Sequence, residues 1–345
     1  MRFKSIEYKL FNFKLTFPFY NSQGLIDSKN VLLLKAKDEN NNIHFGEVSP
    51  LSGFSKEKIN DCVNELNYLI QNKLLFCDLS ELKQNLQKLV SLPSLLFGIE
   101  QLIFSREFTE QNNYSKQNKV VNINAIIGLR EKDSVIKELD NLFNLGFRTF
   151  KIKIGRKNFC NDLSILNSIH KKYGQLIKLR LDNNASWSYE EAKRNIKELN
   201  NFNIEFIEQP VKSEDEIIEL AGKSKINIAV DESLNNYKKT KKLLKENYIN
   251  YFIVKPSIRI GLFDTMKLID EANKLNKNII ISSAYETIIG KATLFYLASL
   301  CKHNFGHGLN TEVLGNNFFK KSNSFSNYFF ETDNLNFNHN LTPYF

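Results

Sequence analysis

The chain has 345 residues, of which 42% are hydrophobic and 25% are charged. This composition excludes a disordered, collagen-like or coiled-coil protein. No apolar run approaches the roughly 18–20 residues that a membrane-spanning helix requires. The first residues mix charges with apolar side chains and lack the core of a signal peptide. We therefore expect a cytoplasmic protein without membrane contact, built as one large barrel or two unequal domains.

The net charge of +9 raises the question of a nucleic-acid partner. The lysines are scattered and form no basic block, so we interpret the charge as solvated surface and expect no nucleic acid. The cysteines show no metal-binding spacing, which indicates reduced thiols. His303 and His307 lie close together but lack a metal-binding pattern, and we expect structural roles for them. The composition leaves the oligomeric state open.

The N-terminal part predicts an α+β domain over residues 1–118. Residues 1–60 alternate apolar and polar side chains with period two, as strands do, and turns interrupt them at Pro18 and Gly24. Residues 56–110 then have helical patterns. We expect a three-stranded sheet followed by a helical hairpin.

From residue 119 to 314 the pattern changes to short apolar runs that alternate with amphipathic stretches. Each run ends in a polar or small residue, and successive ends are separated by 29, 26, 23, 24, 27 and 26 residues. That spacing fits a strand, a loop, a helix and a loop, repeated, which predicts a parallel sheet. The strand ends are Lys153, Asp182, Glu208, Asp231, Lys255, Ser282 and Gly308.

Polar residues at nearly every strand end distinguish between two parallel architectures. An open sheet binds its ligand at one switch point, whereas a barrel gathers all its carboxyl-terminal strand ends around one site. We therefore predict an α/β fold with a (β/α) barrel over 119–314. The Asn- and Phe-rich segment 315–345 is expected to pack back against the first domain.

Three acids, Asp182, Glu208 and Asp231, end successive strands. At a barrel mouth their charges repel strongly unless a cation lies between them. No Cys or His ends a strand, so the ligands are oxygens, which favour Mg²⁺ with Mn²⁺ as a possible substitute.

Lysines lie on both sides of these acids in strand order. Lys151 and Lys153 are two residues apart and face the barrel interior together, and Lys255 follows one strand after the acids. Arg180 shares the inward face of Asp182 and is a candidate contact for an anionic substrate group. A divalent cation held by carboxylates, with lysines as bases, suits removal of a proton next to a carboxylate in a small-molecule substrate.

The motifs together resemble the enolase superfamily in its muconate-lactonising-enzyme subgroup, where a lysine base and Mg²⁺ act together. Three further segments, 46–57, 92–101 and 308–311, resemble the o-succinylbenzoate synthase family, which has a capping domain before its barrel. The motifs that carry the superfamily resemblance are KIKIG (151–155), LRLDNN (179–184), FIEQP (206–210), VDES (230–233), VKP (254–256) and ISSAYE (281–286).

The resemblance implies a role for each strand-end residue. Asp182, Glu208 and Asp231 would bind Mg²⁺. Lys153 would remove the proton α to the substrate carboxylate and return it to the departing hydroxyl, and Lys255 would stabilise the enediolate from the other face. Substrate contacts would come from Lys151, Arg180, Ser282 and Ser283.

The reaction implied is the syn-dehydration of 2-succinyl-6-hydroxy-2,4-cyclohexadiene-1-carboxylate to 2-succinylbenzoate, a step toward menaquinone. The alternative is an N-acylamino-acid racemase or dipeptide epimerase of the same superfamily. Dipeptide epimerases commonly carry an acidic D-x-D at the eighth strand, where this chain has GHGLNTEV (306–313).

The family also implies loops that close over the substrate, at 18–25 and 49–55. Two positions depart from its pattern. Ile260 stands where relatives place a glycine after the second lysine, and Lys291 stands where a neutral residue is usual. Both departures concern the substrate pocket rather than the acids and lysines.

Overall fold

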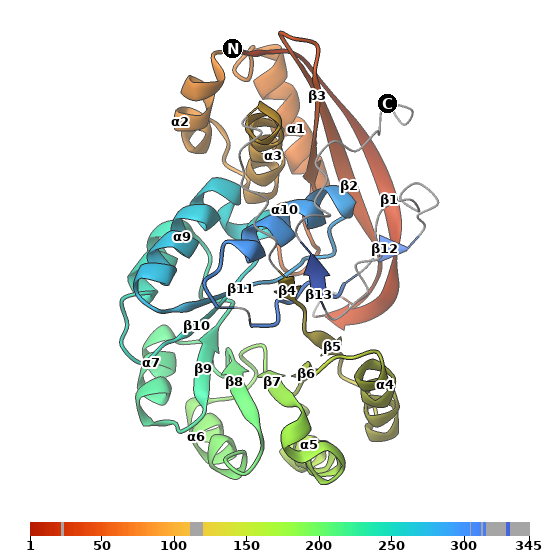
Figure 1. Ribbon diagram of the computed structural model, residues 1–345, viewed down its shortest axis with the longest axis vertical. Coiled ribbons are helices and arrows are strands. Elements are labelled where there is room, and N and C mark those ends of the chain that lie inside the picture. Colours follow the sequence, from red (N-terminus) through yellow and green to blue (C-terminus); the bar gives the residue numbers. More distant parts are fainter. Residues whose placement is uncertain (22–23, 111–119, 304, 312, 315–328, 332–345) are drawn as a thin grey trace.

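The computed structural model describes residues 1–21, 24–110, 120–303, 305–311, 313–314 and 329–331. An α+β capping domain lies against one end of a ring of parallel strands and helices (Figure 1). Within the described ranges, no helix is both long and apolar enough to cross a membrane.

The capping sheet is antiparallel and has the strand order β12-β1-β2-β3. Its alternating apolar residues are buried on both faces. Leu32 and Leu34 pack toward the capping helices, whereas Leu33 on the opposite face packs against Ile288 and Ile289 of the barrel. The sheet is therefore a layer between the two domains. Its strands are β1 (Phe3–Asn21), β2 (Gly24–Asp38), β3 (Ile43–Val48) and β12 (Val313–Leu314).

Three helices follow the sheet, where the sequence predicted a hairpin of two. The additional helix begins after Asp78, whose carboxylate accepts a hydrogen bond from the Ser80 amide at 2.9 Å. A Cβ atom on Gly46 would lie 2.2 Å from the Gly98 carbonyl oxygen, so glycine lets strand β3 and the third helix approach closely. The helices are α1 (Ile59–Gln71), α2 (Leu79–Leu89) and α3 (Pro93–Glu110).

The second domain contains a seven-stranded parallel sheet in sequential order, β5 to β11. Its strands are β5 (Ala125–Ile127), β6 (Thr149–Lys153), β7 (Lys178–Asp182), β8 (Ile204–Glu208), β9 (Asn227–Val230), β10 (Tyr251–Val254) and β11 (Asn278–Ile281). The intervening helices are α4 (Lys132–Asn144), α5 (Phe159–Tyr173), α6 (Tyr189–Glu198), α7 (Glu214–Lys223), α8 (Tyr237–Leu243), α9 (Leu262–Lys274) and α10 (Ile288–Ser299).

A short eighth segment closes the ring. His307 forms a parallel bridge with Ile123 on one side, and Gly308 forms one with Ser282 on the other. The His307 ring accepts a hydrogen bond from the Ile281 amide at 3.0 Å, and burial lowers its pKa to about 3, so the ring is neutral and structural. The predicted barrel with an N-terminal capping domain is confirmed.

The predicted domain limits fall beside stretches outside the described residues, at 111–119 and 315–328. Of the segment 315–345, the structure describes β13 (Phe329–Glu331), which pairs with β4 (Val120–Asn122). The expected packing of the remaining segment on the capping domain lies outside the described residues.

Candidate active site

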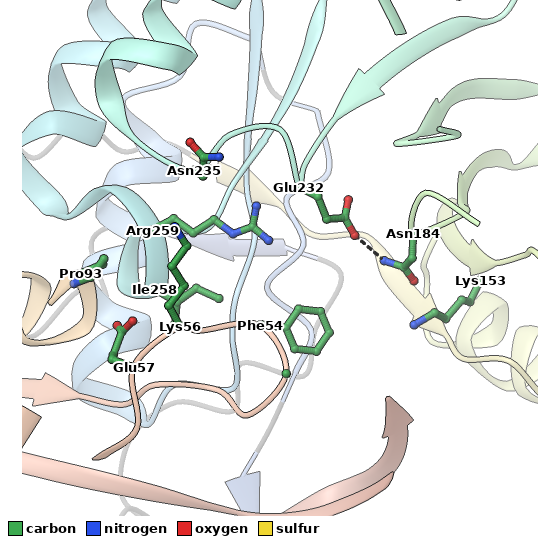
Figure 2. A pocket seen from close by; sticks show the side chains of 11 residues that line it. Phe54, Lys56, Glu57, Pro93, Lys153, Asn184, Glu232, Asn235, Ile258 and Arg259 are labelled. Carbon is green, nitrogen blue, oxygen red and sulfur yellow. Dashed lines mark hydrogen bonds between the residues drawn. The ribbon is translucent and has the colours of Figure 1, made fainter. Parts of the chain in front are cut away.

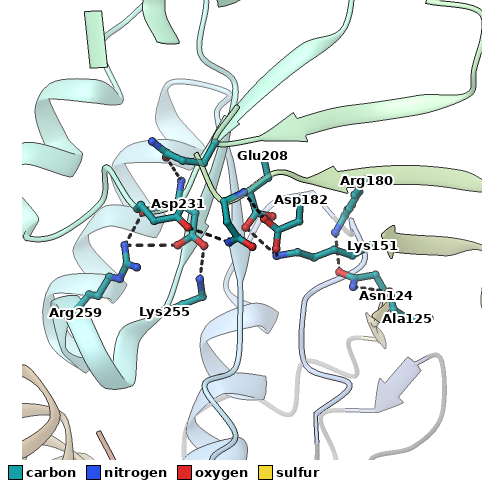
Figure 3. Close-up of polar contacts among 12 residues, drawn as sticks. Asn124, Ala125, Lys151, Arg180, Asp182, Glu208, Asp231, Lys255 and Arg259 are labelled. Carbon is teal, nitrogen blue, oxygen red and sulfur yellow. Dashed lines mark hydrogen bonds and ion pairs between the residues drawn. The ribbon is translucent and has the colours of Figure 1, made fainter. Parts of the chain in front are cut away.

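The three strand-end acids converge with two lysines, Lys151 and Lys255, at the carboxyl-terminal mouth of the barrel (Figure 3). Lys153, Asp182 and Glu208 occupy the same level, because Asp182 is the register partner of both of the others. Lys151 lies one pleat deeper, and its Nζ is 3.0 Å from Asp182 Oδ2 and 2.8 Å from Glu208 Oε1. The inward orientation predicted for Lys151 is confirmed by these two contacts.

The charges in this cluster shift one another's pKa values. Burial alone would lower the pKa of Lys151, but the carboxylates of Asp182, Glu208 and Asp231 raise it above its ordinary value. Burial and the charge of Asp182 raise the pKa of Glu208 well above its ordinary value. The cluster therefore keeps Lys151 protonated and opposes ionisation of Glu208.

Asp231 lies beside two cations. Its Oδ2 pairs with Lys255 Nζ, and Arg259 Nη1 lies 3.6 Å from its Oδ1. Burial would raise the pKa of Asp231, but Lys255 and Arg259 outweigh it and lower that pKa. Gln209 fixes the strand end, because its Oε1 accepts the Asp231 amide at 3.0 Å while its Nε2 donates to Ser233 Oγ at 2.9 Å.

The chemistry of these side chains fits a hard divalent cation. Two buried carboxylate oxygens, Glu208 Oε2 and Asp231 Oδ1, accept no hydrogen bond, which is costly unless a cation or water binds there. In the part of the chain that the structure describes, no group of three His, Cys, Asp or Glu side chains is preassembled around a metal. Lys151 and Lys255 instead hold the other oxygens of these carboxylates.

A pocket of about 550 Å³ opens above the cluster, between the barrel mouth and the capping domain (Figure 2). Lys153 lies in its wall. Asn184 has a left-handed backbone (φ 49°), and its Nδ2 donates to Glu232 Oε1 at 3.0 Å. A left-handed backbone at a non-glycine residue stores strain, and such residues cluster at functional sites. The lining residues are Gly53, Phe54, Lys56, Glu57, Pro93, Lys153, Asn184, Glu232, Asn235, Ile258 and Arg259.

The capping domain supplies the roof of the pocket through the loop after β3. Gly53 turns this loop with a positive φ of 81°, and the Phe54 ring lies 5.7 Å from Lys255 Nζ. Phe19 stacks on Tyr285 with ring centroids 5.2 Å apart and meets Phe54 edge-on. The predicted loop 49–55 thus lies over the strand ends, and its closure over a substrate stays a prediction. The other predicted loop, 18–25, and the turn predicted at Pro18 are wrong for the described residues, because 18–21 end strand β1 and 24–25 begin strand β2. Residues 22–23 lie outside the described residues.

Arg180 is not among the pocket-lining residues, and the substrate contact predicted for it does not fit its position. Its side chain is 1% exposed, with Nε 2.6 Å from Glu205 Oε2 and Nη1 2.9 Å from Asn124 Oδ1. A register irregularity between β7 and β8 leaves Glu205 as an extra residue, as in a β-bulge, and its carboxylate meets Arg180. The guanidinium also donates to the Gly306 carbonyl, so it holds the closing segment of the barrel.

Ser282 and Ser283 are buried beside the strand ends and do not line the pocket. Ser282 bridges to the closing segment at Gly308. The Ser283 hydroxyl donates to Glu286 Oε2 at 2.5 Å and accepts from Thr311 at 2.6 Å. The Ser283 hydroxyl is thus engaged within the protein, and the substrate contacts expected of both serines stay predictions.

Residues 134–319, more than half of the chain, match the family described as enolase C-terminal domain-like. The chain belongs to the enolase superfamily.

Relatives within the enolase superfamily have different activities. The o-succinylbenzoate synthase of Thermosynechococcus vestitus is 23% identical over 310 residues, which cover 88% of this chain and 92% of that one. The L-Ala-D/L-Glu epimerase of Francisella tularensis subsp. novicida is 28% identical over 60% of this chain. The chain spans 63% of that epimerase and 9% of the Arabidopsis thaliana protein PHYLLO, to which it is 30% identical.

Solved structures agree on the fold. A dipeptide epimerase from Enterococcus faecalis, in complex with Mg and the dipeptide L-Leu-L-Tyr, has a TM-score of 0.81 and 21% identity and covers 90% of each chain. At this identity the likeness establishes the architecture. The reaction has to be argued from the site.

Sequence reasoning about this enolase-superfamily chain missed Arg259. After Lys255 the backbone forms a π-helical turn, η2 (Pro256–Ile260), closed by a hydrogen bond of 2.9 Å from the Gly261 amide to the Pro256 carbonyl. Ile260, which stands where a glycine was expected, ends this turn, and Gly261 follows it. Arg259, within the turn, lies in the pocket wall, whereas Lys291 is buried in α10.

Proposed function

We propose that this protein removes a proton α to a carboxylate with Lys153 as the base, and that its reaction is the o-succinylbenzoate synthase reaction. The observation that carries the proposal is the placement of two lysines around three carboxylates. Lys153 ends β6 and Lys255 follows β10, and the strands β7, β8 and β9 between them present Asp182, Glu208 and Asp231.

Asp182, Glu208 and Asp231 would hold Mg²⁺, since carboxylate oxygens are the ligands this ion prefers. The oxygens of Glu208 and Asp231 that accept no hydrogen bond support this assignment. When bound, the ion would supply positive charge to a substrate carboxylate as negative charge develops on it. Mn²⁺ is a possible substitute.

The chain's own residues would then have separate roles in the reaction. Lys153, in the pocket wall, takes the α-proton and returns it to the leaving hydroxyl on the same face, so water departs by syn elimination. Lys255 faces the developing charge as a cation from the opposite side of the ring. Lys151 orients Asp182 and Glu208 through its two ion pairs. Phe54 shields the reaction from water.

The choice of dehydration over epimerisation rests on sequence and coverage. The o-succinylbenzoate synthase of T. vestitus aligns with nearly the whole chain, whereas the Francisella epimerase aligns with 60% of it. The closing segment reads His-Gly-Leu-Asn-Thr at 307–311 and lacks the acidic D-x-D pattern of dipeptide epimerases. Epimerisation or racemisation by the same two lysines remains the second candidate.

An absorbance assay with 2-succinyl-6-hydroxy-2,4-cyclohexadiene-1-carboxylate tests the proposal. We expect rapid loss of the diene with Mg²⁺, no loss with EDTA and recovery when Mg²⁺ is restored. The same protein should be offered N-succinyl-phenylalanine and L-Ala-L-Glu in deuterated water, with α-proton exchange followed by NMR. Exchange in either compound without turnover of the diene would overturn the dehydration and support the second candidate.

A further inference from the structure

Arg259 reaches into the pocket from the π-helical turn and makes few contacts within the protein. Its side chain is 11% exposed, and Nη1 donates to the Asp231 carbonyl oxygen at 2.8 Å. The ion pair of 3.6 Å with Asp231 Oδ1 is its other contact among the described residues. Because a guanidinium carries five N–H donors, most of its donors remain for a ligand.

The surroundings of Arg259 suit a ligand with an apolar body and a charged end. Phe54, Ile258 and Pro93 line the same pocket, and Figure 2 shows the guanidinium between Phe54 and Glu232. The planar fork of arginine binds a carboxylate through two parallel hydrogen bonds, which a lysine cannot do. An anionic group at this position would meet the Arg259 guanidinium beside apolar side chains, while Lys56, Glu57, Lys153 and Glu232 supply the other charges of the pocket lining.

The charges at the barrel mouth also favour a ligand with a second carboxylate. When every group is ionised, as a bound divalent cation would favour at Glu208, four cationic side chains there face four carboxylates and the protein charges balance. A divalent cation adds two positive charges, which a substrate with two carboxylates balances and a zwitterion does not. The groups are Lys151, Lys153, Lys255 and Arg259, with Asp182, Glu208, Asp231 and Glu232.

We propose that Arg259 is a specificity-determining residue that binds a second carboxylate of the substrate, while the first lies at the strand-end acids with the metal. The inference rests on the proposed function for the position of the first carboxylate. It assigns the site to dicarboxylates whose two acid groups are joined by an apolar body.

Calorimetry with Mg²⁺-loaded protein tests this without turnover. The ligands are 2-succinylbenzoate and 2-butyrylbenzoate, which differ by replacement of the distal carboxylate with a methyl group. Wild type should bind the succinyl compound about tenfold tighter or more, and Arg259→Gln should reduce this ratio to near one. Arg194→Gln, on the exposed face of α6, is the matched control and should keep the ratio.

Three results would overturn the inference. Wild type could bind the succinyl and butyryl compounds with equal affinity, the succinyl preference could survive in Arg259→Gln, or Lys56→Gln could lose the preference in place of Arg259→Gln. Mg²⁺ affinity is measured for each variant, because Arg259 also contacts Asp231. If Arg259→Gln binds Mg²⁺ poorly, Arg259→Lys is measured in its place. Lysine keeps the charge but lacks the forked guanidinium, so this variant should retain part of the affinity ratio. An affinity ratio equal to that of wild type would contradict the assignment.

A second ligand pair separates this inference from the dehydration. If neither acylbenzoate binds, N-succinyl-phenylalanine and N-butyryl-phenylalanine are compared in the same way. A succinyl preference that Arg259→Gln removes would then support the role of Arg259 while contradicting the o-succinylbenzoate synthase assignment. Absence of a preference in both pairs would refute the role itself.

Discussion

A comparison of two clusters of buried charged groups among the described residues shows that their carboxylate oxygens are satisfied differently. At the barrel mouth, Glu208 and Asp231 each keep one carboxylate oxygen without a hydrogen bond. The second cluster, here called the interface network, consists of Lys29, Glu47 and Glu286, where the capping sheet meets the barrel.

The interface network is fully hydrogen-bonded. Glu47 accepts from the Thr287 amide at 3.0 Å, from the Thr287 hydroxyl at 2.5 Å and from the Gly290 amide at 3.0 Å, at the start of α10. Glu286 accepts from the hydroxyls of Ser257 and Ser283 and from the Ala284 amide. Lys29 Nζ donates to the Ala284 carbonyl.

The difference separates a site from a scaffold. Unpaired buried acceptors next to cations carry a cost that a ligand can relieve, whereas satisfied acceptors stabilise the fold they belong to. Changes at the barrel mouth should therefore affect binding and turnover. Changes in the interface network should affect the free energy of unfolding.

The largest expected effect is on turnover. Lys153→Ala removes the proposed base and should lower kcat by about 10²–10⁴-fold, with an unchanged circular dichroism spectrum and melting temperature. Lys137→Ala, an exposed lysine of α4, is the control and should match wild type. A kcat within tenfold of wild type in Lys153→Ala would show that another group is the base.

The next effect is on metal binding. Glu208→Gln should weaken Mg²⁺ binding by about 100-fold, measured by calorimetry. In EDTA the same variant should melt at or above the wild-type temperature, because burial and Asp182 already raise the pKa of Glu208 and disfavour its charge. Undiminished Mg²⁺ affinity would remove Glu208 from the ligand set.

A change in the interface network should give the opposite pattern. Glu47→Ala leaves the Thr287 and Gly290 amides without an acceptor and should lower the free energy of unfolding by about 2–4 kcal/mol, measured by urea denaturation. Its Mg²⁺ affinity should stay within about threefold of wild type. The exposed Glu190→Ala should change stability by less than about 0.5 kcal/mol. A Glu47→Ala protein of wild-type stability would contradict the scaffold role.

Glu100 is a buried carboxylate outside both clusters, and its effect on stability depends on pH. Burial in α3 raises the pKa of Glu100 from 4.5 to about 8. Because the pKa is higher in the folded protein, protonated Glu100 contributes fully to the free energy of unfolding below the pKa of the unfolded chain, near 4.5. This contribution is lost as the pH rises through about 8.

Melting curves from pH 5 to 8.5 measure this contribution. As the pH rises, the free energy of unfolding of the wild type should fall relative to that of Glu100→Gln by at most about 1.4 kcal/mol per pH unit. Parallel curves for the two proteins would mean that Glu100 titrates normally.

The sequence predicts the strand-end residues well because their signal is local. An apolar run that ends in Asp182 or Glu208 has few alternatives to a buried strand, and the repeated spacing makes the barrel the common explanation. The ionisable residues at those ends are then brought together by the barrel itself.

The remaining features depend on contacts that no spacing encodes. Arg180 lies two residues before Asp182, which predicts that both side chains face inward, but an irregular register places Glu205 beside Arg180. Arg259 reaches the pocket from a π-helical turn that no spacing in the sequence predicts. Lys29 and Glu47 lie in strands of the capping sheet, and their contacts with the barrel residues Ala284 and Gly290 arise only from tertiary packing.

The central claim is that Asp182, Glu208 and Asp231 hold a divalent cation between Lys153 and Lys255. Crystals soaked with Mn²⁺ and 2-succinylbenzoate test it most directly through anomalous scattering. The account predicts a single strong peak among the three carboxylates, with the two lysines on opposite faces of the ligand. A peak elsewhere, or none at a Mn²⁺ concentration that supports turnover, would contradict it.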